Sequence, residues 1–206
     1  MTEPVIEAFI ESHIEAWAQR AMQRWPNVPH LYGWLRLDRR GRWLIKDEVI
    51  SRPQIVDTIN ANYGADERGA WYFQNGPQRG YVALDAAPLI LSAPVEGDAL
   101  STHLGTPAGA VSRAAIDEQG GLWLLTARGP GWLTDRDLDW ALQRLVSDQG
   151  LVDEARLATV LALPPGATTG LALELEGQRL VLERIDEAGV PAAFGFLREP
   201  TAPATP

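Results

Sequence analysis

The sequence contains no cysteine, which excludes disulfides, catalytic thiolates and metal centres with cysteine ligands. It has only three histidines, His13, His30 and His103, and their spacing matches neither a metal site nor a catalytic triad. No apolar run approaches the roughly 20 residues that a membrane-spanning helix needs, and the N-terminus lacks the pattern of a signal peptide. We therefore expect a cytoplasmic protein that has no metal site, no other cofactor and no recognisable catalytic residue.

Positive charge is also scarce. The chain of 206 residues carries 18 basic and 27 acidic side chains, a net charge of −9, and Lys46 is the only lysine. A general nucleic-acid binder needs a cationic surface to displace counterions from phosphate, and docking on anionic lipid has the same requirement. The predicted partners therefore exclude nucleic acid and membranes and include a small-molecule ligand or a protein.

The first 29 residues are predicted to form a helix and a linker. Thr2 can cap a helix over residues 3–25, and Pro26 ends it. Its apolar residues recur at helical spacing: Ile6, Phe9, Ile10, Ile14, Trp17, Ala21 and Trp25. We expect this helix to cover a sheet; the alternative is that it binds a partner, including a second copy in a homo-oligomer.

Residues 30–92 are predicted to form a hairpin–helix–hairpin unit. Two strands flank the turn Arg39-Arg40-Gly41, and a helix follows Ser51. Two later apolar runs are joined by the turn Asn75-Gly76-Pro77. The alternation of the first strand places Trp34 and Arg36 on one face of the sheet and two leucines on the other.

The second half of the chain repeats this order of elements. Asp117 and Gly120 flank a hairpin turn as Asp38 and Gly41 do, and helices, a hairpin and a closing strand at 193–197 follow. Residues 93–109, rich in Pro and Gly, are predicted to be a linker, 110–199 a second unit, and 200–206 a disordered tail. The predicted fold class is α+β: an N-terminal helix followed by two tandem hairpin–helix–hairpin units with largely antiparallel sheets, packed as a pseudo-symmetric pair.

The first unit also resembles an uncharacterised bacterial family of unknown function. The resemblance covers residues 31–92 and extends to the second half by topology alone. It rests on Leu37-Asp38 with Gly41 and Trp43, on Ile50-Ser51-Arg52-Pro53, on Trp71-Tyr72-Phe73, and on the run Val82–Leu89. It implies duplicated strand-and-helix units like those of pleckstrin-homology folds and a role in signal transduction, and it implies no catalytic residue.

The eight tryptophans are the feature of the composition that most favours a binding site. Packing in the core is the simplest explanation for most of them. The alternative is a groove between the two units, where aromatic walls and arginines receive an apolar or anionic ligand. The candidate ligand-binding residues for such a groove are Trp34, Arg36, Arg52, Trp71 and Arg128.

The leading functional hypothesis is a non-catalytic module that binds a ligand or a protein, with a regulatory role in bacterial signal transduction. It rests on the absence of a catalytic constellation and on the resemblance. Two alternatives remain open. One is an enzyme that acts on a small anionic metabolite in the cleft between the units, and the other is a structural protein that forms a homodimer.

Overall fold

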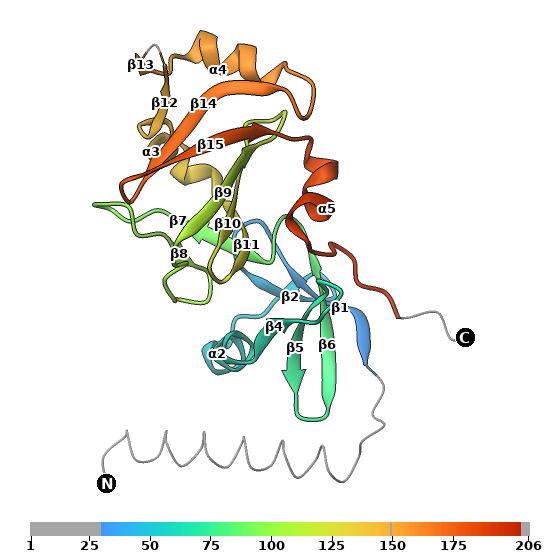
Figure 1. Cartoon of the computed structure of the whole chain (residues 1–206). Coiled ribbons are helices and arrows are strands. Elements are labelled where there is room, and N and C mark those ends of the chain that lie inside the picture. The colour runs from blue at the N-terminus through green and yellow to red at the C-terminus, as the bar shows by residue number, and fades with distance from the viewer. Residues whose placement is uncertain (1–29, 149, 203–206) are drawn as a thin grey trace, which may run out of the picture. The chain divides into compact units, whose positions relative to one another are not determined.

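The computed structural model describes residues 30–148 and 150–202, so the predicted N-terminal helix and most of the predicted tail lie outside the described residues. The described chain divides into two compact units (Figure 1). Unit 1 comprises residues 30–36, 43–83 and 199–202. Unit 2 comprises residues 37–42 and the described residues between 84 and 198.

Unit 1 contains a six-stranded sheet in the order β3-β2-β1-β6-β5-β4. Asp85 donates its backbone N–H to Leu37 O, so the C-terminal ends of β1 and β6 lie side by side and these two strands run in parallel. The other pairs with a recorded register are antiparallel. The elements are β1 (Leu31–Leu37), β2 (Trp43–Ile45), β3 (Glu48–Val49), α2 (Pro53–Ala61), β4 (Tyr63–Ala65), β5 (Trp71–Asn75) and β6 (Gln78–Leu84).

Helix α2 covers one face of this sheet. Trp43 donates its indole N–H to Asn60 Oδ1 at 2.8 Å, which ties β2 to the helix. The Tyr63 ring lies 4.9 Å from the rings of both Trp43 and Trp71. Ile59 of α2 is buried with them. The face of the sheet that carries Trp43 and Trp71 is therefore the core of unit 1.

Unit 2 contains a nine-stranded mixed sheet in the order β13-β12-β14-β15-β9-β10-β11-β7-β8. Two of its pairs, β11 with β7 and β15 with β9, are parallel. Its strands are β7 (Leu89–Ser92), β8 (Ser101–Thr102), β9 (Val111–Ile116), β10 (Leu122–Thr126), β11 (Gly129–Leu133), β12 (Leu145–Ser147), β13 (Gly150–Leu151), β14 (Thr168–Leu175) and β15 (Gln178–Arg184). Its α-helices are α3 (Leu138–Leu142), α4 (Glu154–Leu161) and α5 (Val190–Phe194).

The two sheets share an order of strands. Within the sheet of unit 2, the run β11-β10-β9-β15-β14-β12 follows the same chain order as β3-β2-β1-β6-β5-β4 in unit 1. The central parallel pair is β1 with β6 in one sheet and β9 with β15 in the other. Positions on β1 can therefore be matched to positions on β9 by counting back from the hairpin turn that follows each strand.

The predicted fold class was wrong. Most of the regular secondary structure in the described residues is strand, in two large mixed sheets, and these residues contain only four short α-helices of five to nine residues. The apolar runs are short and alternate with period two, so they form strands, and the helices between them stay short. Parallel pairing of distant segments, such as β15 with β9, makes the sheets mixed where antiparallel sheets were predicted.

One local prediction was also wrong. The run at 193–197, predicted as a closing strand, includes the end of helix α5, which begins with Pro191 in its first turn and ends at Gly195 in the left-handed region at φ 73°. Residues 93–109, predicted as a linker, contribute β8 to the second sheet.

One hairpin turn occurs three times in the described chain. In each copy an aspartate Oδ1 accepts the backbone N–H groups two and four residues later, and the third residue after the aspartate is a glycine at positive φ. The aspartates are Asp38, Asp66 and Asp117. The first and third copies were predicted from the sequence, whereas the second, Asp66-Glu67-Arg68-Gly69, was not.

Gly41, in the first of these turns, permits a close approach to the loop that follows β8. A Cβ at this position would lie 2.7 Å from His103 Cβ, and Gly41 has a φ of +76°. We expect Gly41→Ala to lower the free energy of unfolding by about 3 kcal/mol, because the left-handed backbone and the clash both cost energy. Gly105→Ala is the matched control, since Gly105 has φ +75° and no atom within 4 Å of its Cβ position. If urea unfolding shows that the two variants lose the same free energy of unfolding, the close contact between Gly41 and His103 does not contribute to stability.

Candidate binding face

The face of the unit 1 sheet opposite α2 carries aromatic and cationic side chains. Alternation along β1 places Tyr32 and Trp34 on this face, because Leu35 and Leu37 are buried on the other. Tyr72 on β5 is directly opposite Tyr81 on β6. We call this surface the aromatic–cationic face and define it by Tyr32, Trp34, Lys46, Tyr72, Arg79 and Tyr81.

The rings of this face contact one another across three strands. Tyr32 and Tyr81 are stacked, with centroids 4.6 Å apart and planes at 4°. Tyr72 meets Tyr81 edge-on at 5.8 Å. Tyr81 is buried beneath its neighbours, whereas Trp34 is 47% exposed. An exposed tryptophan beside a stacked tyrosine pair is a preformed apolar surface, because no side chain must be reordered before another molecule contacts it.

Two cations of the face lie over its rings. Lys46 Nζ is 3.7 Å from the centroid of the Trp34 ring, and the Arg79 guanidinium is 4.2 Å from that of Tyr72. Arg79 Nε also donates to Gln74 Oε1 at 3.2 Å. Neither cation has a carboxylate within ion-pair distance in the described part of the chain. Both positive charges are therefore held in place and remain available to an anionic group.

Arg68 lies at the edge of the face and is already neutralised. Its hydrogen bond to Asp66 raises the pKa of the Arg68 guanidinium above its ordinary value. Burial acts to raise the pKa of Asp66, but hydrogen bonds from Ala70 and Arg68 outweigh it and lower the pKa overall. Asp66 also accepts the Tyr81 hydroxyl at 3.1 Å. This second Asp-x-x-Gly turn therefore fixes the tyrosine at the centre of the face.

Four of the five residues predicted as a ligand site belong to unit 1, where they do not share one face, and the fifth belongs to unit 2. Trp34 and Arg36 are on the open face of β1, where Arg36 forms an ion pair with Asp47 at 2.8 Å. Trp71 points into the core of unit 1 and is 8% exposed. Arg52 is the N-cap residue of α2. Arg128 belongs to unit 2, where its Nε donates to Pro107 O at 2.7 Å.

Five members of the face were not predicted from the sequence: Tyr32, Lys46, Tyr72, Arg79 and Tyr81. The signal that could have found them is alternation, since Tyr32 precedes Trp34 by two residues and Arg79 precedes Tyr81 by two. The predicted groove between the two units stays a prediction.

A hollow of about 610 Å³ in unit 2 is the second candidate site. Arg144 at its wall donates to Asp98 Oδ1 at 2.9 Å and to the carbonyl oxygens of Gly97 and Trp140. The hydrogen bond from Arg144 lowers the pKa of Asp98, which keeps this carboxylate ionised near neutral pH. The charges of Arg144 and Asp98 thus neutralise each other. Its lining residues are Asp98, Gln143, Arg144, Glu174, Leu175, Gly177, Gln178 and Arg179.

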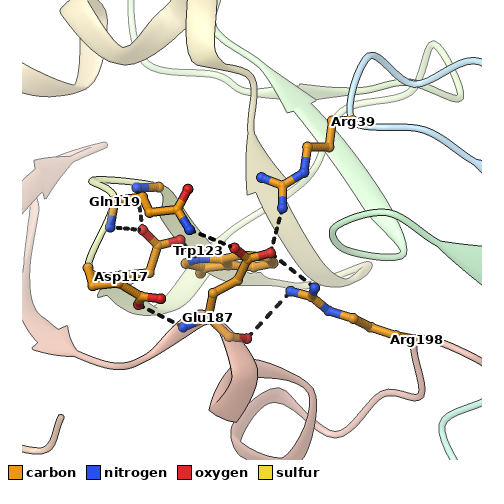
Figure 2. Close-up of polar contacts among 8 residues, drawn as sticks. Arg39, Asp117, Gln119, Trp123, Glu187 and Arg198 are labelled. Carbon is orange, nitrogen blue, oxygen red and sulfur yellow. Dashed lines mark hydrogen bonds and ion pairs between the residues drawn. The ribbon is translucent and has the colours of Figure 1, made fainter.

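A cluster of polar side chains around Glu187 is the third candidate (Figure 2). The Glu187 carboxylate accepts from Arg39, from Arg198 at 3.0 Å and from Gln119 at 3.3 Å. The Arg198 guanidinium lies over the Trp123 ring at 5.7 Å. Because three donors already occupy the carboxylate, Glu187 is not poised as a catalytic base, and we assign the cluster a structural role.

Among residues 30–148 and 150–202 no group of three or more His, Asp or Glu side chains is placed to hold a metal ion. Within the same residues no helix is long and apolar enough to cross a membrane.

Comparisons with known proteins place the fold and the family. A solved structure of a DUF1285 family protein from Silicibacter pomeroyi DSS-3 is 16% identical, aligns over 76% of this chain and 84% of that chain, and has a TM-score of 0.50. A DUF1285 family protein from Shewanella baltica OS155 is also 16% identical, over 50% of this chain and 86% of its own, with a TM-score of 0.40. At such identity the first likeness concerns the fold alone. No curated protein matches the chain.

A family model matches residues 14–201, which is most of the chain. The family is DUF2944, whose description reads "Protein of unknown function (DUF2946)". This agrees with the expectation of an uncharacterised family. The chain therefore belongs to the DUF2944 family of proteins of unknown function.

Proposed function

We propose that the chain is a non-catalytic binding module that recognises a protein partner through the aromatic–cationic face of unit 1. The single observation that carries this proposal is a difference between the two sheets. The face of the unit 2 sheet that corresponds to the aromatic–cationic face is contacted at Arg113 by the chain's own helix α5, whereas the face in unit 1 exposes Trp34.

The correspondence follows from register. Trp34 precedes the turn aspartate Asp38 by four residues, and Arg113 precedes Asp117 by four, so Trp34 and Arg113 occupy matching positions on β1 and β9. The Arg113 guanidinium donates to Ala193 O at 2.6 Å and lies 4.8 Å from the centroid of the Phe194 ring. Both of these partners are in α5. A short helical segment with an aromatic residue is therefore the kind of structure that this sheet face accommodates.

The composition of the face suits a protein partner. Tyrosine, tryptophan and arginine are the residues enriched at the centres of protein interfaces, because they bury a large area at low cost in side-chain entropy. The rings of Tyr32, Tyr72 and Tyr81 are already fixed by mutual contacts. The free energy lost in ordering them on binding is correspondingly small.

A duplicated, pleckstrin-homology-like architecture with a role in bacterial signalling is the finer form of this proposal. The shared strand order of the two sheets supports the duplication. Among the described residues the aromatic–cationic face occurs in unit 1, and this supports a division in which helix α5 contacts the corresponding face of unit 2 and a partner binds unit 1.

Selection of a random twelve-residue peptide library on the full chain tests the proposal. We expect the tightest peptides to lose at least about tenfold in affinity for Trp34→Ala and for Tyr72→Ala, as interface aromatic residues commonly do. Trp140→Ala is the matched control, since Trp140 is a partly exposed tryptophan of unit 2. If the peptides bind both face variants as tightly as the wild type, the face is not the binding surface.

A further inference from the structure

We infer that the segment recognised by the aromatic–cationic face is acidic and supplies carboxylates to Lys46 and Arg79. This inference rests on the proposed function and specifies the chemistry of the partner. It follows from a comparison with the other cations that lie over aromatic rings in the described chain, each of which is also paired with a carboxylate.

Five arginines besides Arg79 lie over aromatic rings in the described residues, and each also pairs with a carboxylate of the chain. The ring holds the guanidinium in place, and the carboxylate neutralises the charge of the guanidinium. The two contacts together stabilise the arginine more than either contact alone. Arg39 and Arg198 share Glu187, Arg68 pairs with Asp66, Arg113 with Glu183, and Arg144 with Asp98.

Lys46 and Arg79 are the two exceptions among the described cations over rings. Each has the ring, Trp34 for Lys46 and Tyr72 for Arg79, and neither has a carboxylate within ion-pair distance in the described part of the chain. Both are members of the same open face. The two incomplete ring–cation pairs are thus concentrated where a partner is proposed to dock.

The position of the two cations defines the partner further. Lys46 directly follows β2, and Arg79 is on β6; both strands flank β1. The two residues are therefore separated by two strand spacings, roughly 10 Å, across the sheet. One short segment with two acidic residues and an aromatic or apolar residue between them can contact both cations and the exposed ring of Trp34.

A protein segment fits these observations better than a nucleic acid does. Binding to a nucleic-acid backbone draws on many phosphate contacts, and its affinity scales with their number. Only two uncompensated cations are present on the face, and the chain as a whole carries a net charge of −9. A long polyanion extends beyond the face and is repelled by the negative charge of the rest of the molecule. A short acidic segment contacts only the face.

Fluorescence anisotropy on the full chain, with a labelled random copolymer of glutamate and tyrosine as the probe, tests the inference. We expect binding that the double variant Lys46→Glu, Arg79→Glu weakens at least about tenfold, because two attractive contacts become repulsive. A neutral double variant, Lys46→Gln with Arg79→Gln, should fall between the two and show a weaker dependence of affinity on salt. Thermal melts confirm that the variants compared are folded.

Arg52→Glu is the matched control. Arg52 is an exposed cation of unit 1 with no ring beneath it in the described residues, and its change should alter the affinity less than twofold. Unchanged binding by both double variants, absence of copolymer binding, or binding of a twelve-nucleotide oligothymidine in its place would overturn the inference. If library peptides depend on Trp34 but not on Lys46 and Arg79, the inference fails while the proposed function stands.

Discussion

Replacing Asp117 with alanine is expected to lower the free energy of unfolding by about 4 kcal/mol, the largest effect of any single substitution considered for this chain. Asp117 is 2% exposed. Its Oδ1 accepts the backbone N–H groups of Gln119 and Gly121 at 2.9 and 2.8 Å, and its Oδ2 accepts the Trp123 indole N–H at 2.8 Å. Alanine removes the acceptor of all three donors, and the Trp123 indole N–H is then left unsatisfied in a buried place.

Asp117→Asn separates these contributions. Its side-chain oxygen can still accept from the turn, but its amide N–H₂ then faces the Trp123 indole N–H, so two donors oppose each other. We expect a loss of about 2 kcal/mol, between wild type and alanine. Asp148→Ala is the matched control, because the Asp148 side chain is 95% exposed in its ion pair with Arg179 and such pairs contribute little. A loss below about 1 kcal/mol for Asp117→Ala in urea unfolding would contradict this account of the turn.

Acid is expected to destabilise the protein through His103. Burial lowers the pKa of His103 to about 4, from an ordinary value near 6.5. The unfolded chain therefore binds a proton as the pH falls through 6.5, whereas the folded chain does so only near 4. The stability that His103 contributes is complete above pH 6.5 and is lost between pH 6.5 and 4, by about 3 kcal/mol in total.

The measurement is the free energy of unfolding in urea at a series of pH values. Between pH 6.5 and about 4.5, the change in the free energy of unfolding comes largely from His103. Hydrogen bonds from Arg113 and Arg144 lower the pKa of Glu183 and Asp98, so these carboxylates titrate at more acidic pH. Whatever the stability of the His103→Gln variant, its free energy of unfolding should depend much less on pH in this interval than that of the wild type. A slope that persists in the variant would show that another group is responsible.

The sequence predicted the local parts of the fold better than the distant ones. The hairpin that includes Trp34 and Trp43, the helix after Arg52 and the hairpin at 171–185 are present, because alternation, a proline in the first helical turn and tight-turn residues act over a few residues. The parallel pairing of β7 with β11 was missed, since no local pattern specifies which distant strand a short apolar run joins. Helix α5 was predicted as a strand because its apolar run is too short to show a period.

The same limit applies to the candidate site. Alternation placed Trp34 and Arg36 on one face of β1, and the structure agrees. Trp71 is a tryptophan like Trp34 but lies in the core, because the pairing of β5 determines which face of the sheet a residue occupies, and the number of aromatic residues in the sequence does not. Lys46 and Arg79 become meaningful only when the rings beneath them and the missing carboxylates are known, and both depend on contacts between strands.

The most direct test of the central claim is hydrogen exchange of the full chain, followed by mass spectrometry, with and without a peptide selected from the library. Binding at the aromatic–cationic face should slow exchange in β1, β5 and β6, in the segments that contain Tyr32, Tyr72 and Tyr81. Peptides from unit 2, including β14 and β15 at the hollow near Arg144, should be unchanged. Protection confined to unit 2, with none in β1, β5 or β6, would contradict the claim that this face is the binding surface.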